Sequence, residues 1–309
     1  SIFFVNSADK LINTKLFYQS ETNNIYTITS DSTGVWISFR GGRLEYRSHN
    51  SAQLIHSTTI LQDRFNVLFV DKAENLWGYL GRSKRIMKFD RNFKTENIEI
   101  EENQLTTISV FHQEESGKIL IGGNGRKAFL FEYSPEQKKF LNISSTFKGN
   151  INSNLYVMDI YNGSPKLFAT SIGLFTEEGS EIEHDIYNEN FKLTLTKSVL
   201  RSKNSTIWVG SENGVYALLK NDFIHFDKSD GLPNSSIIAR GLVLDDFSRL
   251  WVGTAGGLAY ASENEIGNNR TSTPIIIGYS KEIKSNLISG DDFQSIKAGS
   301  TIDFTFISI

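Results

Sequence analysis

Five arginines lie in or just after glycine-containing turns in the first half of the chain. Guanidinium groups bind carboxylate and sulfate in bidentate geometry, so on a shared face these residues would form a basic rim that engages an acidic saccharide or an acidic partner surface. Arginine at a hairpin tip also keeps a sheet edge soluble, and we favour that structural role. The residues are Arg40, Arg43, Arg82, Arg85 and Arg126. The corresponding later turns carry Ser171, Glu212, Asn213 and Ala255 instead.

The histidines show no metal-binding or catalytic pattern. No H-x-H or H-E-x-x-H spacing occurs, and the absence of Cys excludes thiolate nucleophiles and Cys-ligated zinc. The sequence also lacks a G-x-S-x-G elbow and a P-loop. It therefore predicts no catalytic residues, no metal site and no cofactor. The histidines concerned are His49, His56, His112, His184 and His225.

One glycine-rich segment fits a loose dinucleotide-binding pattern. Residues 123–128 read Gly-Asn-Gly-Arg-Lys-Ala, which matches G-x-G-x-x-A. The next five residues, Phe-Leu-Phe-Glu-Tyr, alternate like a strand, so no helix N-terminus follows to bind a pyrophosphate. We interpret the segment as a hairpin turn.

Composition narrows the class of protein further. The 309-residue chain has a net charge of −3, which gives no reason to expect nucleic acid or an anionic membrane as partner. No apolar run approaches the ~20 residues that span a bilayer, so we expect membrane attachment only through missing parts of a parent chain. Aromatic residues make up 12 %, and 24 Gly against 4 Pro supply the turns. These proportions favour strands.

A repeated pattern organises the chain. Six segments each contain an apolar strand, a polar turn, a short apolar run, a glycine-containing turn and another strand. They recur at intervals of about 40 to 48 residues, and all 4 Trp fall at one position of the repeat. The residues at this position are Trp36, Trp77, Leu120, Phe168, Trp208 and Trp251.

The repeat predicts an all-β fold. Its Asx, Ser and Gly residues form tight turns, and no helical apolar periodicity persists beyond ten residues. A four-stranded antiparallel sheet cannot bury both of its faces alone, but a ring of such sheets can. We therefore predict a β-propeller over residues 1–262. It has six four-stranded antiparallel blades, or seven if one repeat is too diverged to detect.

The two ends of the chain bear on how the ring closes. Residues 2–6 align with the outer strand of the fifth repeat, so we predict that they supply the outer strand of the last blade. After Ser262 the pattern changes. Residues 263–309 form a linker and the opening strands of a truncated second domain, or an extension lying against the ring, because about 46 residues are too few for a complete sandwich of about 100.

The fifth and sixth repeats resemble those of two-component-regulator propellers, most clearly at Asp230–Asn234 and Leu250–Leu258. The resemblance covers residues 1 to about 262. It implies the extracytoplasmic sensor region of a bacterial hybrid histidine kinase, in which an immunoglobulin-like sandwich, a membrane helix and cytoplasmic signalling domains follow the propeller. Residues 270–309 resemble the start of that sandwich. Propellers of this family usually have seven blades, from which a count of six departs.

The resemblance implies a non-catalytic, glycan-responsive sensor module in the periplasm, belonging to an inner-membrane protein that is a dimer when intact. Its expected partners are an oligosaccharide or acidic saccharide and a neighbouring propeller or sandwich domain. A protein-interaction scaffold without a small-molecule ligand is the first alternative. A propeller glycosidase or lyase is the second, although Asp31–Gly34 departs from the Asp-box spacing of sialidase-like propellers.

Overall fold

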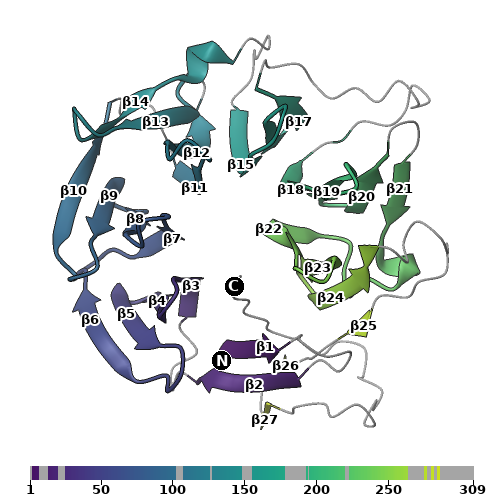
Figure 1. Cartoon of the computed structure of the whole chain (residues 1–309), viewed down its shortest axis with the longest axis horizontal. Coiled ribbons are helices and arrows are strands. Elements are labelled where there is room, and N and C mark those ends of the chain that lie inside the picture. The colour runs from purple at the N-terminus through teal and green to yellow at the C-terminus, as the bar shows by residue number, and fades with distance from the viewer. Residues whose placement is uncertain are drawn as a thin grey trace.

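The computed structural model is an all-β molecule, as predicted, with its strands standing in sheets around a common centre (Figure 1). Two short 3-10 turns, Ser144–Thr146 and Lys228–Asp230, lie in connections between sheets. The structure describes residues 2–6, 13–19, 25–101, 107–125, 127–147, 155–177, 193, 195–219, 223–263, 275–276, 280–281 and 284–285.

Six sheets follow one another along the chain, and within each sheet the strands are antiparallel and in sequence order. The first three sheets are β3 (Ile25–Ser30), β4 (Gly34–Phe39), β5 (Arg43–Ser48) and β6 (Leu54–Thr59); β7 (Phe65–Val70), β8 (Leu76–Leu80), β9 (Arg85–Phe89) and β10 (Thr95–Ile100); and β11 (Thr107–Gln113), β12 (Ile119–Gly125), β13 (Leu130–Ser134) and β14 (Lys139–Asn142). The last three are β15 (Leu155–Tyr161), β16 (Leu167–Thr170) and β17 (Gly173–Thr176); β18 (Thr196–Arg201), β19 (Ile207–Ser211), β20 (Gly214–Leu218) and β21 (Phe223–Phe226); and β22 (Ile237–Leu244), β23 (Arg249–Thr254), β24 (Gly257–Ser262) and β25 (Ile275–Ile276).

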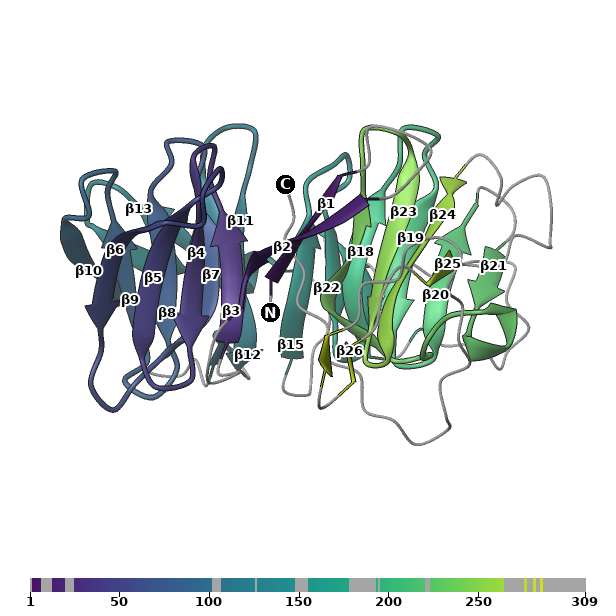
Figure 2. The same ribbon diagram turned by 90° about the horizontal axis from the view of Figure 1, so that it is seen from below.

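The first strand of each sheet lies nearest the centre of the ring, and later strands lie progressively outward (Figure 1). Seen edge-on in Figure 2, the strands run along the short axis of the ring. Turns between second and third strands therefore share one face of the ring, which we call the rim face. Turns between first and second strands lie on the opposite face. This arrangement is a β-propeller.

The N-terminal segment closes the ring differently from the prediction. β1 (Ile2–Asn6) pairs with β2 (Asn13–Tyr18), and the hairpin lies between the first and sixth sheets (Figures 1 and 2). The fourth strand of the sixth sheet is β25, which pairs with β24. Two strands separated by a short connection pair at a lower loop-closure cost than strands from opposite ends of the chain. The prediction that residues 2–6 form the outer strand of the last blade is therefore wrong.

Apolar clusters lie between consecutive sheets, as the propeller model requires. Trp36 packs between the first and second sheets, Trp77 between the second and third, and Trp208 between the fifth and sixth. These three side chains are 1–3 % exposed. A further cluster joins Ile2 and Phe17 of the hairpin to the first sheet. The first five sheets thus bury both faces because each has a packed neighbour on both sides.

Five of the six predicted repeat positions are equivalent in the sheets, and Phe168 is the exception. Counted from the bulge in the inner strand, the residue matching Trp208 in the fourth sheet is Leu167. Leu167 faces the fifth sheet, whereas Phe168 faces the third. The first two strands of this sheet are each one residue shorter between the bulge and their connecting turn. A one-residue shift exchanges the two faces of a strand, which corrects the alignment.

Backbone pairing also joins neighbouring sheets at two places. β10 pairs with β14 in parallel over two residue pairs, and β12 pairs with β15 over two more. As a result the strands from β7 to β17 form one continuous hydrogen-bonded sheet. The short pairs β26 (Ser280–Lys281) and β27 (Lys284–Ser285) follow β25. The sandwich predicted for 263–309 falls almost entirely outside the described residues and stays a prediction, as does the blade number.

Candidate ligand-binding site

A bulge interrupts the inner strand of every sheet close to the rim face. At each bulge, one or more inner-strand residues have no partner across the ladder to the second strand. Bulges re-aim side chains and are common beside binding sites. The residues are Tyr26, Asn66, Ser109, Met158, Lys197 and the segment 238–241.

The longest bulge, in β22, presents Arg240. Residues 238–241 stand opposite Gly253 alone. Arg240 has φ 55° and is, among the described residues, the sole non-glycine residue with positive φ inside a strand. Such a backbone costs about 1–3 kcal/mol and is typical of functional sites. The next residue is Gly241, where an added Cβ would lie 2.7 Å from the carbonyl oxygen of Gly253, so the bulge requires glycine there.

Arg240 projects among the inner strands while remaining in contact with water. By surface area its side chain is exposed. Burial nevertheless lowers the pKa of the guanidinium, against the opposing effects of Asp159 and Tyr156. The exposed surface and the lowered pKa are both expected for a side chain that has strands around it but remains open to water. The guanidinium remains charged at neutral pH.

Two tyrosines from distant sheets reach the same region. Burial raises the pKa of Tyr156, and neighbouring Tyr26 of β3 raises it further, whereas Arg240 of β22 lowers it. Tyr26 is 39 % exposed. Its ring is covered on one side by the Arg64 guanidinium, whose carbon lies 4.3 Å from the ring centroid. Arg64 also donates from Nε to Oδ1 of Asn66, at 3.3 Å. The inner strands thus bring two phenols and two guanidiniums together.

Asp159 of β15 joins three inner strands. Its Oδ2 accepts hydrogen bonds from the Ser198 hydroxyl and the Val199 amide, both at 3.0 Å. Ser198 in turn accepts from the Leu242 amide at 3.2 Å. Burial raises the pKa of Asp159 to about 6, although these donors and Arg240 favour the carboxylate. The contacts connect the fourth, fifth and sixth sheets next to the Arg240 bulge.

Lys197, the bulge residue of β18, is already neutralised. Its Nζ lies 2.6 Å from Oε1 of Glu212 and donates to the Ser236 hydroxyl at 3.2 Å. The same pairing lowers the pKa of Glu212. This network ties the β19–β20 turn to the connection that precedes β22. It has no charge left for a ligand.

The structure places four of the five predicted rim arginines on the rim face. Arg40 and Arg43 lie at the β4–β5 turn, and Arg82 and Arg85 at the β8–β9 turn. Arg126 lies outside the described residues. The prediction that these turns share one face therefore holds for the first two sheets. Whether the arginines bind a ligand stays a hypothesis.

Two of these four arginines, Arg43 and Arg82, are held by contacts with nearby residues. Arg43 pairs with Glu45 at 3.0 Å and lies over the Phe39 ring. Arg82 donates to the carbonyl of Gln62 at 3.2 Å. Within the described part of the chain, the side chains of Arg40 and Arg85 make no hydrogen bond or ion pair. These contacts agree with the structural role that we favour for rim arginines.

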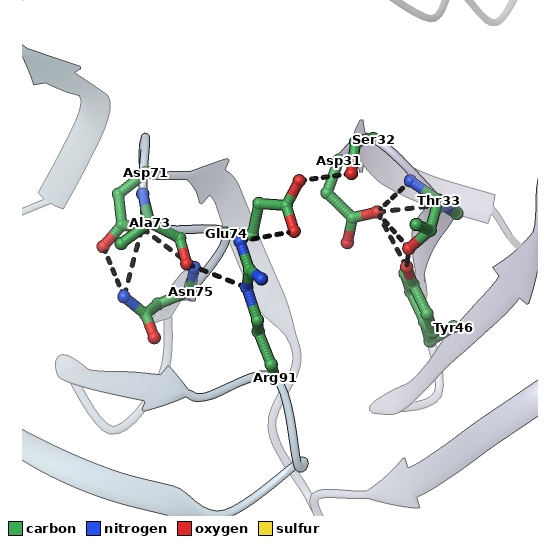
Figure 3. A network of polar contacts seen from close by, with 10 residues as sticks. Asp31, Ser32, Thr33, Tyr46, Asp71, Ala73, Glu74, Asn75 and Arg91 are labelled. Carbon is green, nitrogen blue, oxygen red and sulfur yellow. Dashed lines mark hydrogen bonds and ion pairs between the residues drawn. The ribbon is translucent and has the colours of Figure 1, made fainter.

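A second polar network lies on the opposite face, between the first two sheets (Figure 3). Asp31 accepts from the amides of Thr33 and Gly34 and from the Tyr46 hydroxyl, at 2.7–2.8 Å. Glu74 accepts from the Ser32 hydroxyl of the neighbouring sheet and pairs with Arg91 at 2.9 Å.

In the next turn the Asp71 carboxylate accepts from the Asn75 amide and from the indole N–H of Trp77, both at 2.8 Å. The same contact recurs in the sixth sheet, where Asp245 accepts from the Trp251 indole at 2.9 Å. These carboxylates hold turns and indoles and link the first two sheets, which are structural roles.

The described histidines lie away from the Arg240 bulge. His56 and His225 belong to the outer strands β6 and β21, where they stack on Phe93 and Tyr216. His49 follows β5, His112 lies in β11 near the opposite face, and His184 is outside the described residues. No group of three or more His, Asp or Glu in the described ranges is placed to hold a metal ion.

The described residues of the glycine-rich segment 123–128 are the end of β12 and part of its connection to β13, in line with a hairpin, and Arg126 lies outside them. Gly123 and Gly125 belong to β12, the Gly123 amide donates to the carbonyl of Phe129, and β13 follows. In the described residues no helix begins there to accept a pyrophosphate.

The molecules most similar in fold include bacterial sensors. The extracellular domain of the hybrid two-component system BT3049 from B. thetaiotaomicron superposes with a TM-score of 0.62 at 18 % identity, covering 92 % of this chain and 40 % of that one. That of BT4673 from the same organism gives 0.59 at 18 % identity, over 80 % and 34 %. The chain thus spans less than half the length of these sensors. They are of the kind that the sequence resemblance named.

An enzyme has the same fold. Virginiamycin B lyase from Staphylococcus aureus superposes with a TM-score of 0.58 at 13 % identity, over 79 % of this chain and 83 % of the lyase. Comparison with family models and with curated proteins found no match to the sequence. At these identities the likeness establishes the fold, a β-propeller, and leaves function to the site. In the described residues no helix is long and apolar enough to cross a membrane.

Sequence reasoning did not identify the Arg240 region. The sequence indicates a bulge only weakly, because the strand residues before and after it stay apolar and the inserted residues do not have the composition of a turn. One trace is present: Ile-Ile-Ala-Arg-Gly-Leu, residues 237–242, puts an arginine and a glycine inside an otherwise apolar strand. Glycine within a strand pattern is a known indicator of a bulge.

Proposed function

We propose that this chain is a non-catalytic ligand-recognition module from the extracytoplasmic sensor region of a bacterial two-component signalling protein. The fold shared with two such extracellular domains supports the proposal, together with the repeat motif in the fifth and sixth sheets. The observation that carries it at the level of the site is Arg240, which has a strained backbone in an inner strand and whose side chain makes no hydrogen bond or ion pair with the described residues. Strained backbone of this kind clusters at functional sites.

The finer parts of the proposal concern the ligand and the context. The ligand is a glycan, and the neighbouring domain is a second propeller or the sandwich that begins within 263–309. The intact receptor is a periplasmic dimer anchored in the inner membrane. Ligand binding would bias the relative placement of these domains and thereby the output of the dimer.

A glycan panel tests the proposal against the scaffold alternative. Calorimetry or thermal shift with plant, fungal and host oligosaccharides should give saturable binding to at least one of them, with a Tm that rises with ligand concentration. A flat response to the whole panel would favour a scaffold that recognises only protein. Binding of a separately expressed neighbouring domain would then be the positive result.

The lyase fold favours one enzymatic candidate. The superposition with virginiamycin B lyase covers most of both chains. Incubation with a streptogramin B antibiotic and mass spectrometry of the products tests this activity directly. Ring-opened product formed in proportion to the protein concentration would replace the sensor proposal. We expect intact antibiotic.

A further inference from the structure

The Arg240 guanidinium has an unused capacity for an anion. No ion pair within 4.0 Å and no hydrogen bond links Arg240 to any other described residue, although its side chain projects among the inner strands. Asp159 interacts with Arg240 electrostatically, but no ion pair joins them, and the Asp159 oxygens already accept from the Ser198 hydroxyl and the amides of Ile160 and Val199. The planar donors of Arg240 remain available for a bidentate partner.

The groups around Arg240 define what that partner looks like. Tyr26 and Tyr156 each offer an aromatic face and a hydroxyl, and such amphipathic rings bind molecules with one apolar and one polar side. Arg64 covers one face of Tyr26 and adds a second positive charge. A carboxylate carried on a sugar ring satisfies both requirements, because the carboxylate pairs with a guanidinium and the ring stacks on a phenol.

We propose that Arg240, with Tyr26, Tyr156 and Arg64, forms a binding site for the carboxylate of an acidic sugar at the centre of the ring. The inference rests on the proposed sensor function and deepens it by assigning the ligand class and the residues. It places the ligand among the inner strands instead of on the rim arginines. In the described part of the rim, aromatic and cationic side chains from several sheets do not converge in a comparable way.

The test compares Arg240→Gly with Arg85→Ala. Glycine accepts the positive φ of residue 240, so Arg240→Gly removes the guanidinium without adding backbone strain. Arg85→Ala removes one positive charge from the rim, which matches the change in net charge. The probes are sodium glucuronate and sodium galacturonate, each with its neutral methyl ester, titrated into the folded protein and followed by calorimetry and tyrosine and tryptophan fluorescence.

We expect wild-type protein to bind at least one acid, and to bind it at least tenfold more tightly than its ester. Arg240→Gly should weaken that binding tenfold or more with an unchanged melting profile, Arg85→Ala should leave it within twofold, and Arg240→Lys should retain part of it. Equal binding of acid and ester, no binding of either acid, or unaltered affinity in a folded Arg240→Gly would each overturn the site.

The result also separates this inference from the proposed function. A protein that binds a neutral oligosaccharide of the panel irrespective of Arg240 is still a glycan sensor, but its site lies elsewhere. A protein that binds no saccharide, acidic or neutral, refutes both.

Discussion

At the scale of single residues, the turn aspartates stabilise the propeller by holding indole groups. Asp71 is 7 % exposed and serves both its own turn and the buried Trp77. Asp90 caps a turn in the same way, accepting from the amides of Asn92 and Lys94, but receives no indole. The pair separates the contribution of the indole contact from that of the turn.

We predict that Asp71→Ala lowers the free energy of unfolding by about 2–3 kcal/mol, because it leaves a buried indole N–H without an acceptor. Asp90→Ala should cost about 1 kcal/mol or less, as expected for an exposed turn. Urea unfolding followed by tryptophan fluorescence measures both. Equal costs would show that the indole contact contributes nothing.

His112 makes stability depend on pH. Burial lowers its pKa to about 4, helped by Lys166 and Lys72 and opposed by Glu114, and its Nε2 is buried without a hydrogen-bond partner. The unfolded chain, with a pKa of about 6.5, takes up the proton first as the pH falls. His112 therefore costs stability between about pH 6.5 and 4, by up to about 2 kcal/mol for a partly buried group.

His112→Leu should accordingly flatten the loss of stability below pH 6.5 and leave the pH dependence of stability above pH 6.5 unchanged. Denaturant unfolding at pH 8, 6 and 4.5 checks this. If the variant and wild-type curves keep a constant separation across that range, His112 does not titrate in this way.

At the scale of elements, a glycine two residues after the repeat position, Gly122 in the third sheet and Gly210 in the fifth, allows adjacent sheets to approach. A Cβ on Gly210 would lie 2.7 Å from Cγ2 of Ile237 in the next sheet, and Ile237 is fully buried. A Cβ on Gly41, at the β4–β5 turn, would meet no atom within 4 Å. The motif glycine is thus a packing residue.

Gly210→Ala should destabilise the protein by about 1–3 kcal/mol through overpacking, whereas Gly41→Ala should change stability by less than about 0.5 kcal/mol. Thermal unfolding by calorimetry distinguishes them. A Gly210→Ala variant with wild-type Tm would mean that the inner strands yield without cost.

Much of this element-level architecture could be predicted because the repeat signals are local. The tryptophan interval, the Asx turns and the short β-branched runs specify the sheets and their order. The alignment failed at Phe168 because paired one-residue deletions in β15 and β16 preserve the hydrogen-bond ladder while exchanging its faces. Aligning Gly173 with Gly214 at the next turn would have put Leu167 opposite Trp208. The Arg240 bulge was not predicted from the sequence, because the residues around it come from distant repeats.

At the scale of the whole molecule, the hairpin β1–β2 covers one face of the first sheet. Ile2 and Phe17 pack on Val35 and Ile37, which are fully buried. If residues 2–6 had formed the outer strand of the last blade, as predicted, other residues would have had to cover this face of the first sheet. Sequence comparison between repeats could not reveal the hairpin, because it has no counterpart among them.

Deleting residues 1–19 should expose that apolar face, lower the Tm by several degrees and promote association. Differential scanning calorimetry and light scattering, with a deletion of only residue 1 as control, measure both effects. An equally stable monomer would show that the first sheet needs no cover.

The pairings of β10 with β14 and of β12 with β15 join the second, third and fourth sheets through backbone hydrogen bonds. From Phe65 to Thr176 backbone hydrogen bonds join the strands into one continuous sheet, whereas in the described residues no strand pairing joins this sheet to β6 or to β18. Under mechanical force or partial denaturation, we expect the ring to open first at the two ends of this continuous sheet. Residues 65–176 should then stay folded after the sheets on both sides of them have unfolded.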